Sequence, residues 1–522
     1  MEVLTACQRS LNRVGIHTRT KKLACPINRL PLDVLLLIPT HLTSLGDRLR
    51  VTFVCRRWRQ TFLQHAPLWS QMSLAGSTHR CLVTTILERV RRSPLDITLN
   101  YRESPFEEVT LLFPFAQQIK RLLVEGASWA QVRELLEAIP GPVSLHTLRI
   151  WDDGEYDPLP LPDPLLSPLL SGAVNVKKLD FFVSNPLTLS CFTFPNLTTF
   201  EFWTWVGCEL FPISLLLNFL KASPSLQEID ITIAADLFLE DVPPDATLVL
   251  PDVTTFSLAI TSDRLGYEIS TRISCPSART VKFEHGPENP GRDIPDDIFL
   301  PSRSWTKIFR HDTTGVVQKV VLKLAVDEDT DINCLLTFSS SKGTSLETHY
   351  SHGYVSDIDD IGVDLNKRHS QAFSQACSKI RDHTLLENLR YLHIRGGNVL
   401  AGDLKLATSD VGKLLGSIGP LEEFTLESCD LRPYLDAFLD TPLFPDAFHP
   451  ASFPLVGRLA IIDPMQPFCN NGIYAAAIVK LAESQHARGA PFERMAFNTR
   501  VPFAVIQELL LFVDTVDETL LN

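Results

Sequence analysis

The residues best suited to chemistry are the carboxylates of the segment Asp357–Gly362, DIDDIG. Oxygen ligands at its first and third positions and glycine at its sixth are typical of the start of a calcium-binding loop. The fifth position is Ile361 and the twelfth is Arg368, where such a loop needs an oxygen ligand and a bidentate glutamate. The segment is therefore predicted to be a solvated acidic loop that binds no metal.

No other pattern predicts a catalytic centre or a cofactor site. The segment Ser341–Thr344 resembles a phosphate-binding loop only superficially, because its lysine precedes its glycine. The 14 histidines include no H-E-x-x-H pair, no serine lies in a G-x-S-x-G turn, and the 11 cysteines include no C-x-x-C pair. His393, on a predicted strand, is expected to face the surface or a partner. We expect a protein without catalytic activity or cofactors, in a reducing compartment.

Three aromatic residues recur at one position of a repeated pattern and suggest a binding surface. Trp151, Phe182 and Trp203 each follow the last apolar position of a predicted strand. Charged residues lie close to them, namely Arg149, Asp180, Glu201 and Asp230. Exposed aromatic side chains with a charged margin are typical of binding hot spots, so these seven residues are predicted to bind a protein substrate. Alternatively, a loop such as Asp157–Pro168 covers the aromatic side chains and extends the core.

The pattern that positions these residues is Φ-x-x-Φ-x-Φ, where Φ is apolar. Its copies begin at Ile119, Leu145, Val176, Leu197, Leu226, Val253, Ala278, Val317, Leu389, Leu421, Val456 and Phe492. From Ile119 to Ala278 the starts are 26, 31, 21, 29, 27 and 25 residues apart. The last apolar positions alternate with polar ones, as in half-buried strands, and helices such as Ser214–Leu220 fill the gaps.

The spacing and the loose motif resemble degenerate leucine-rich repeats. The resemblance implies an α/β fold, a solenoid with a parallel sheet inside and helices outside, over residues 111–515. Residues 75–110 are expected to be connecting helices. Two segments break the repeat: His285–Ser304 reads as a long loop, and residues 323–387 are expected to hold an insertion, with a polar loop over Ser339–Asp364 and a helix near Ser370–Ile380.

A different pattern occupies residues 28–74. Leu30-Pro31 precedes an apolar run that ends near Ile38, and proline suits the first turn of a helix. Asp47 is expected to cap a second helix, and the run from Val54 to Trp58, VCRRW, to open a third. Pro39 is expected to end or kink the first helix, because proline lacks the backbone donor.

In order and spacing, Leu-Pro, the aliphatic run, Val-Cys-Arg-Arg-Trp and a final Leu-Trp resemble the F-box, and the sequence of the segment is similar to that of F-box proteins of mushroom-forming fungi. The resemblance implies a small helical module that docks on a Skp-type adaptor of a cullin-RING ubiquitin ligase. The residues that it assigns to the adaptor are Leu30, Pro31, Leu35, Ile38, Leu42, Leu49, Val54, Cys55, Arg57, Trp58, Leu68 and Trp69. The alternative is a plain three-helix bundle whose apolar residues form only its own core.

The charge distribution favours a protein partner over nucleic acid. Residues 1–92 carry fifteen Lys and Arg against four Asp and Glu, a net charge of +11; because the chain carries −13 in all, the remainder carries −24. An acidic body repels a polyanion, whereas a basic head fits an acidic protein surface. Residues 1–27 are expected to be a disordered basic leader. No apolar run is long enough to span a membrane, and we expect a cytoplasmic or nuclear protein.

These features together predict the substrate-recognition subunit of a Skp-cullin-F-box type ubiquitin ligase. The head would bind the adaptor and cullin assembly, and the repeats would hold an unidentified protein substrate. The alternative is a leucine-rich repeat interaction scaffold without ligase recruitment, which Pro39 favours.

Overall fold

A computed structural model describes most of the chain. The described residues are 30–42, 44–102, 109–139, 144–152, 174–183, 189, 192–204, 211–234, 238–239, 247–261, 263–285, 317–326, 332–341, 343, 345–352, 389–395, 415, 418–427, 455–462, 472–498 and 501–518. The calcium-like segment Asp357–Gly362, the loop Asp157–Pro168 and the helix expected near Ser370–Ile380 lie outside them, as does all but the first residue of His285–Ser304.

The N-terminal head consists of short helices. They are α2 (Leu32–Leu37), the 3₁₀ turn η2 (Ile38–His41), α3 (Leu45–Val51), α4 (Arg56–Gln64) and α5 (Ala66–Trp69). The α-helical geometry of α2 ends one residue before the turn that contains Pro39, as the missing backbone donor predicts. The spacing of Trp58 and Phe62 on α4 places both on its buried face.

The cap of α3 differs from the prediction. Ser44, and not Asp47, is the N-cap residue, because the Ser44 hydroxyl accepts a hydrogen bond from the Asp47 backbone N–H at 3.0 Å. Asp47 lies in the first turn, where its carboxylate accepts from the Ser44 hydroxyl at 2.7 Å. Serine satisfies a free N–H of the first turn at the cap, and a carboxylate just inside the helix interacts favourably with the helix dipole.

One large sheet dominates the rest of the described chain. Its first nine strands in spatial order are β1 (Gln71–Ala75), β2 (Leu95–Asn100), β3 (Ile119–Ala127), β4 (Thr147–Asp152), β5 (Lys178–Val183), β6 (Thr199–Thr204), β8 (Glu228–Ile233), β11 (Thr255–Ile260) and β13 (Thr280–His285). The order continues with β16 (Ser345–His352), β15 (Ile332–Ser340), β14 (Val317–Val326), β17 (Tyr391–Arg395), β18 (Leu421–Glu427), β19 (Val456–Ile462), β20 (Phe492–Phe497) and β21 (Val513–Glu518). Neighbouring strands are parallel except at β16–β15 and β15–β14.

The apolar pattern explains which face of the sheet is buried. On β4 every second residue is buried, and the copy Leu145, Leu148 and Ile150 has no exposed surface. The second and third apolar positions of all twelve copies are buried in the same way. The residues between them are at least partly exposed in most copies, with Asp180 and Thr425 as buried exceptions, so one face of the sheet packs into the core and the other is the more open one.

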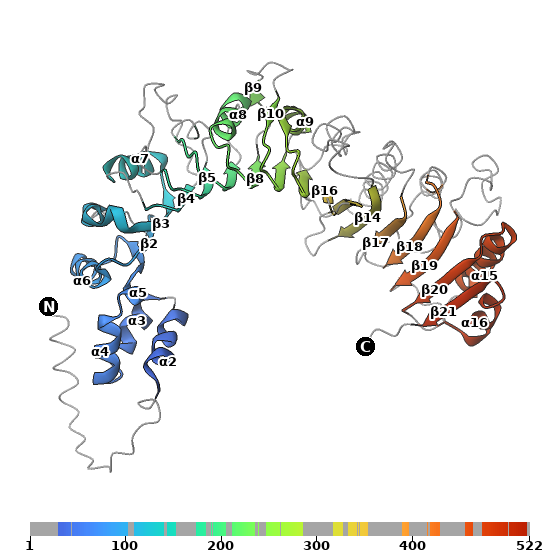
Figure 1. Ribbon diagram of the computed structural model, residues 1–522, viewed down its shortest axis with the longest axis horizontal. Helices are drawn as coiled ribbons and strands as arrows, with labels where there is room; N and C mark the ends of the chain where they lie inside the picture. Colours follow the sequence, from blue (N-terminus) through green and yellow to red (C-terminus); the bar gives the residue numbers. More distant parts are fainter. Residues whose placement is uncertain are drawn as a thin grey trace, which may run out of the picture.

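Helices cover the buried face. They are α6 (Arg80–Val90), α7 (Trp129–Ala138), α8 (Ile213–Lys221), α9 (Asp263–Arg272), α15 (Gly472–Ala487) and α16 (Phe503–Leu509), with the 3₁₀ segment η3 (Val109–Gln118). The sheet forms the inside of an arc and these helices lie on its outside (Figure 1). Two short pairs, β7 (Phe211–Pro212) with β9 (Phe238–Leu239) and β10 (Leu248–Val249) with β12 (Ile273–Ser274), lie beside it. A mixed α/β body behind a helical head is thereby confirmed.

Two predicted boundaries need correction. Residues 75–110 contain α6 and β2 rather than helices alone, and the sheet begins at β1, because Met72 and Leu74 alternate with polar residues and pack into the same core. Within residues 323–387, the expected polar loop contains strand β16, and the described part continues the sheet. The antiparallel β14–β15–β16 segment reverses the chain twice within the sheet, which explains why the spacing of the repeats fails there.

Candidate functional site

The core of the head is formed by residues that the F-box pattern contains. Trp58 packs edge-on against Phe62 at 5.3 Å between ring centroids, and the Trp69 indole N–H donates to the Phe62 carbonyl at 2.9 Å. Leu35 and Leu68 are also buried. These side chains therefore hold the helices together, and truncating them is expected to destabilise the head.

The twelve residues assigned to the adaptor by resemblance fall into three groups. Buried are Leu35, Trp58, Leu68 and Trp69; partly buried are Leu30, Ile38, Leu42, Leu49, Cys55 and Arg57; exposed are Pro31 and Val54. Only the last two groups are accessible in the free chain. The adaptor contacts of all twelve stay a prediction.

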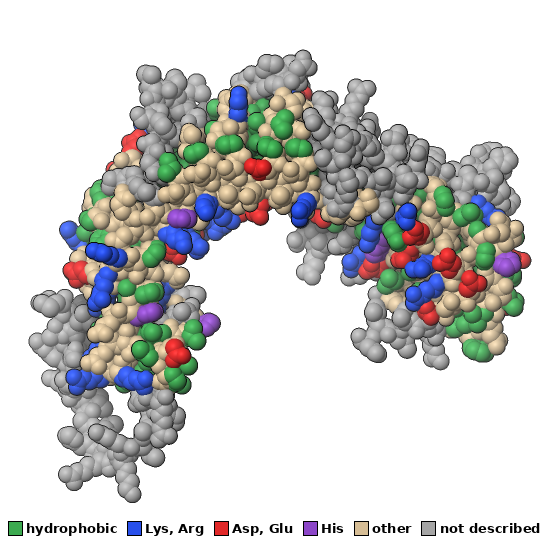
Figure 2. All heavy atoms as spheres, in the orientation of Figure 1, with side chains coloured by type: hydrophobic (Ala, Val, Ile, Leu, Met, Phe, Trp, Pro, Cys, Tyr) green, Lys and Arg blue, Asp and Glu red, His purple; other side chains and the backbone are tan. Residues whose placement is uncertain are grey.

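The surface of the head carries large apolar side chains, and of these the sequence reasoning assigned only Val54 to the adaptor. Leu32, Val34 and Leu37 on α2, and Phe53 and Val54 between α3 and α4, are each at least 40% exposed. Apolar side chains lie beside Lys and Arg side chains on the surface of the head (Figure 2). Exposed apolar residues of this size are typical of an interaction site. Leu32 and Leu37 are five residues apart, whereas the apolar face of an amphipathic helix is recognised by spacings of three and four residues.

Arg48 joins the head to the sheet. It is 5% exposed, and its guanidinium donates to the carbonyls of Leu42 at 3.0 Å, Leu68 at 3.2 Å and Gln71 at 2.5 Å. Burial lowers the pKa of Arg48 from its ordinary value. Because Gln71 begins β1, this one side chain fixes α3 against the first strand. Arg57 forms a link within the head, because it lies on α4 and donates to the carbonyl of Leu30, just before α2, at 2.7 Å.

The second candidate surface lies on the concave face of the sheet. All seven residues predicted to bind substrate come together there on β4, β5, β6 and β8, in two parallel rows across the strands. The aromatic row is Trp151, Phe182 and Trp203, and the charged row is Arg149, Asp180, Glu201 and Asp230. The ring centroids are 6.4 Å apart between Trp151 and Phe182 and 6.2 Å apart between Phe182 and Trp203. The aromatic row is thus continuous.

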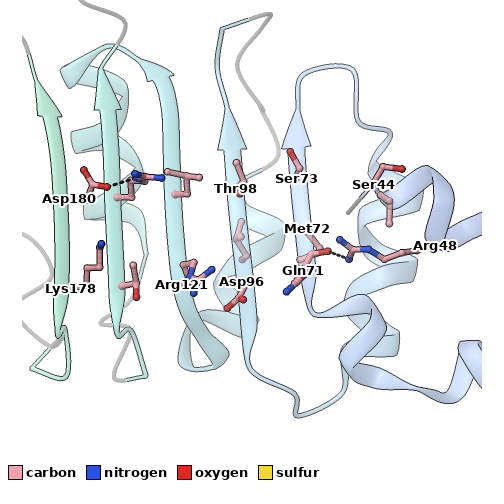
Figure 3. Close-up of a pocket in the computed structure, with 15 residues that line it drawn as sticks. Ser44, Arg48, Gln71, Met72, Ser73, Asp96, Thr98, Arg121, Lys178 and Asp180 are labelled. Carbon is pink, nitrogen blue, oxygen red and sulfur yellow. Dashed lines mark hydrogen bonds and ion pairs between the residues drawn. The ribbon is translucent and has the colours of Figure 1, made fainter. Parts of the chain in front are cut away.

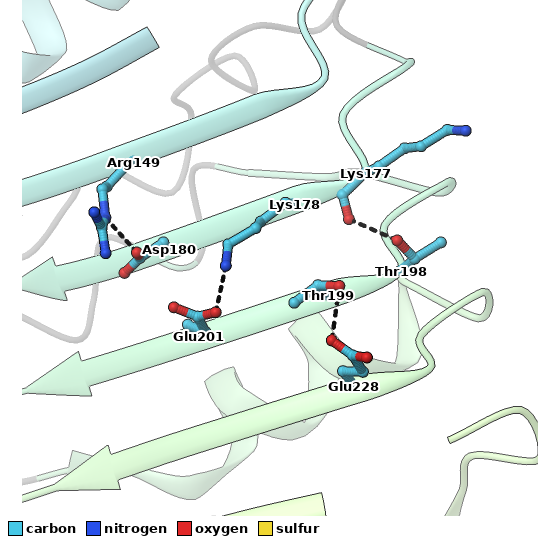
Figure 4. A network of polar contacts seen from close by, with 8 residues as sticks. All are labelled: Arg149, Lys177, Lys178, Asp180, Thr198, Thr199, Glu201 and Glu228. Carbon is cyan, nitrogen blue, oxygen red and sulfur yellow. Dashed lines mark hydrogen bonds and ion pairs between the residues drawn. The ribbon is translucent and has the colours of Figure 1, made fainter. Parts of the chain in front are cut away.

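Ion pairs across the strands order the charged row (Figure 4). Arg149 pairs with Asp180, and Lys178, which the sequence reasoning missed, pairs with Glu201. Lys178 could have been found from the alternation of β5, since it lies two residues before Asp180 on the same face. Burial raises the pKa of the Asp180 carboxyl, and the Arg149 guanidinium opposes this shift.

Among the described residues, no salt bridge joins Asp230 to a basic side chain. Burial raises the pKa of its carboxyl, whereas a hydrogen bond from Ser257 lowers it; the charges of Glu201 and Glu284 raise it further, and the charge of Lys282 lowers it. Thr232 continues the aromatic row beside Trp203 as a small polar residue. Trp203, which is 45% exposed, is therefore the last aromatic residue of the row and lies beside the acidic residues Glu201 and Asp230.

A polar groove of about 810 Å³ connects the head to this surface. Its walls are formed by α3 and by β1 to β5 (Figure 3). Arg48 and Gln71 line it at the head end, Arg121 in the middle, and Arg149 and Asp180 at the far end. The groove therefore runs along the concave face and ends in the charged row.

The described residues contain no group of three or more His, Cys, Asp or Glu side chains placed to hold a metal ion. His393 lies half-buried on β17 with its Nε2 2.9 Å from a carboxylate oxygen of Glu427, and burial lowers the pKa of its imidazole. Within the same part of the chain, no helix is long and apolar enough to cross a membrane.

Comparison with known proteins bears on the head. Residues 27–75 match the family model described as F-box-like. This segment includes all the helices of the head and extends to the end of β1. A search of curated proteins gave no match. The chain thus carries an F-box-like domain, followed by a large, mostly parallel sheet with helices.

Proposed function

We propose that this chain is the substrate-recognition subunit of a Skp-cullin-F-box type ubiquitin ligase. The observation that carries the proposal is the F-box-like match over residues 27–75, in a head whose surface presents large apolar side chains. The head docks on the Skp-type adaptor, which links the chain to the cullin. The subunit has no chemistry of its own and accelerates ubiquitin transfer by holding the substrate near the conjugating enzyme.

The body is a leucine-rich-repeat-like solenoid in this proposal. Support comes from the succession of parallel strands, the buried apolar positions 26, 31, 21, 29, 27 and 25 residues apart from Ile119 to Ala278, and the helices on the outside of the arc (Figure 1). A protein substrate binds the concave face, where the aromatic row of Trp151, Phe182 and Trp203 offers apolar contact area and the charged row gives orientation.

The experiment that tests the proposal is a pull-down of the full-length chain with a Skp-type adaptor and cullin. Leu32→Asp and Leu37→Asp each place a charge on exposed apolar surface of α2, so they leave the core intact and are expected to weaken adaptor binding at least about tenfold. Leu510→Asp is the matched control, because Leu510 is 52% exposed and lies at the opposite end of the chain. Wild-type protein that retains neither adaptor nor cullin would refute the ligase role.

A second candidate function is an interaction scaffold that recruits no ligase. It is favoured by the early end of α2 at Leu37, before the 3₁₀ turn that contains Pro39. A shortened first helix offers less surface to an adaptor. Pro39→Leu separates the two candidates: in a scaffold, binding to the adaptor is absent in the wild type and gained in this variant.

A further inference from the structure

The sheet already contains one filled cation site, formed by its own residues. The Arg149 guanidinium lies 4.3 Å from the ring centroid of Trp151, on the same strand, and pairs with Asp180 on the next strand. The indole ring from the aromatic row and the carboxylate from the adjacent charged row, on neighbouring strands, thus bind the guanidinium together. This arrangement shows what the concave face can recognise.

Strand β6 repeats the aromatic position and the neighbouring carboxylate, but it carries no cation at the position equivalent to Arg149. Trp203 occupies the position of Trp151, and Asp230 on β8 lies beside β6 as Asp180 lies beside β4. The position of Arg149 is taken by Glu201. In the described part of the chain, no Lys or Arg stacks on Trp203, and 45% of this side chain is open to solvent.

The charges around Trp203 favour a cation from outside. Glu201 and Asp230 are register neighbours on adjacent strands, about 4.8 Å apart, and repel each other. Lys178 pairs with Glu201 at 2.5 Å, but in the described part of the chain no salt bridge joins a basic side chain to Asp230. An incoming positive charge would relieve this repulsion. Residues 93–522 carry a net charge of −24, which attracts basic partners over longer distances.

We propose that Trp203, Glu201 and Asp230 bind an arginine side chain of the protein substrate. A planar guanidinium stacks on an indole ring and donates to two carboxylates at once, whereas an ammonium group does neither as well. The inference rests on the proposed function, because it names the side chain by which the concave face would recognise a protein substrate.

The test uses a phage-displayed library of random nonapeptides, selected on the immobilised full-length chain. The selected peptides are expected to share an arginine at one position. Synthetic copies in which citrulline replaces that arginine, with the same shape but no charge, are expected to bind about tenfold more weakly, as the loss of one charge-assisted hydrogen bond predicts. Trp203→Leu is expected to reduce binding of the arginine peptides by a similar factor and Trp203→Phe by less.

Phe503→Leu is the matched control, because Phe503 is 72% exposed on α16, outside the arc. The inference is overturned if no peptide is selected, if the selected peptides share no arginine, or if citrulline binds equally well. A shared lysine in its place would refute the guanidinium assignment. Adaptor binding is measured on the same samples: its absence refutes the proposed ligase role, and the peptide result then stands or falls independently.

Discussion

Replacing Arg48 by methionine is expected to loosen the junction between the head and the sheet. The methionine side chain keeps much of the apolar stem but loses the donors that reach the carbonyls of Leu42, Leu68 and Gln71. The hydrogen bond to Leu68 is buried, and the other two are partly buried. Local opening of α3 from β1 should therefore become easier, while strands far along the arc stay unaffected.

The magnitude follows from these three contacts. Leaving one buried carbonyl unsatisfied costs about 1–3 kcal/mol, and each hydrogen bond that water can partly replace contributes about 0.5–1.5 kcal/mol. Release of the ordered arginine side chain returns up to about 2 kcal/mol of conformational entropy. At the middle of these ranges the net loss of local stability is about 2 kcal/mol, which corresponds to roughly 30-fold faster exchange through local opening.

Amide hydrogen exchange resolved by peptide mass spectrometry is the suitable assay, because unfolding of a chain of 522 residues is not a two-state process. Exchange over α3 and β1 should accelerate by the stated factor. Arg50→Met is the matched control: Arg50 lies on the same helix but forms an exposed surface pair with Asp47 at 2.7 Å, which contributes little. Unchanged exchange in Arg48→Met, or equal acceleration in both variants, would refute the role of Arg48.

Three further predictions concern single positions. Asp230→Asn should raise the thermal midpoint of unfolding at pH 7, because burial raises the pKa of Asp230 and its ionised form destabilises the fold. The difference in midpoint between variant and wild type should vanish as the pH falls below about 4, where the carboxyl is protonated in both the folded and the unfolded state. A difference that stays the same across a pH series of melting curves would contradict this prediction. Gly126→Ala should lower the free energy of unfolding by about 1–3 kcal/mol, because the φ angle of Gly126 is +67° and the added Cβ would overlap the Arg102 side chain and lie 3.0 Å from the Arg102 backbone nitrogen. Equal melting temperatures of variant and wild type would contradict this prediction. Ser44→Ala should cost about 1 kcal/mol through loss of the α3 cap, visible as faster exchange at the start of that helix and nowhere else.

The strands of the sheet follow directly from the printed sequence. A repeated pattern of apolar residues at every second position can bury only one face of a strand, so Leu148 and Ile150 lie inward wherever the strand is placed. The same alternation puts Trp151 and Trp203 on the opposite face. Their proximity in the folded chain follows from the parallel register of β4, β5 and β6, which keeps equivalent positions in line.

Some boundaries could not be predicted in this way. The pattern fails at residues 323–387 because β14, β15 and β16 run in alternating directions, and strand direction depends on the partner strand rather than on the segment itself. Strand β1 is short and lies at the end of the F-box-like segment, so its five residues give little periodic signal. The exposure of Leu32 and Leu37 likewise depends on what packs against α2.

By itself, the sequence determined the F-box-like head, the strand segments and the outward-facing positions of the aromatic residues, because each depends on residue type and spacing along the chain. Only the tertiary structure decided that Arg48 fixes the head to β1 and that Trp151 holds an arginine while Trp203 does not. Those facts depend on which side chains meet across elements far apart in the sequence. The periodicity of apolar residues along the chain does not predict such contacts, because sheet register and burial determine which side chains touch.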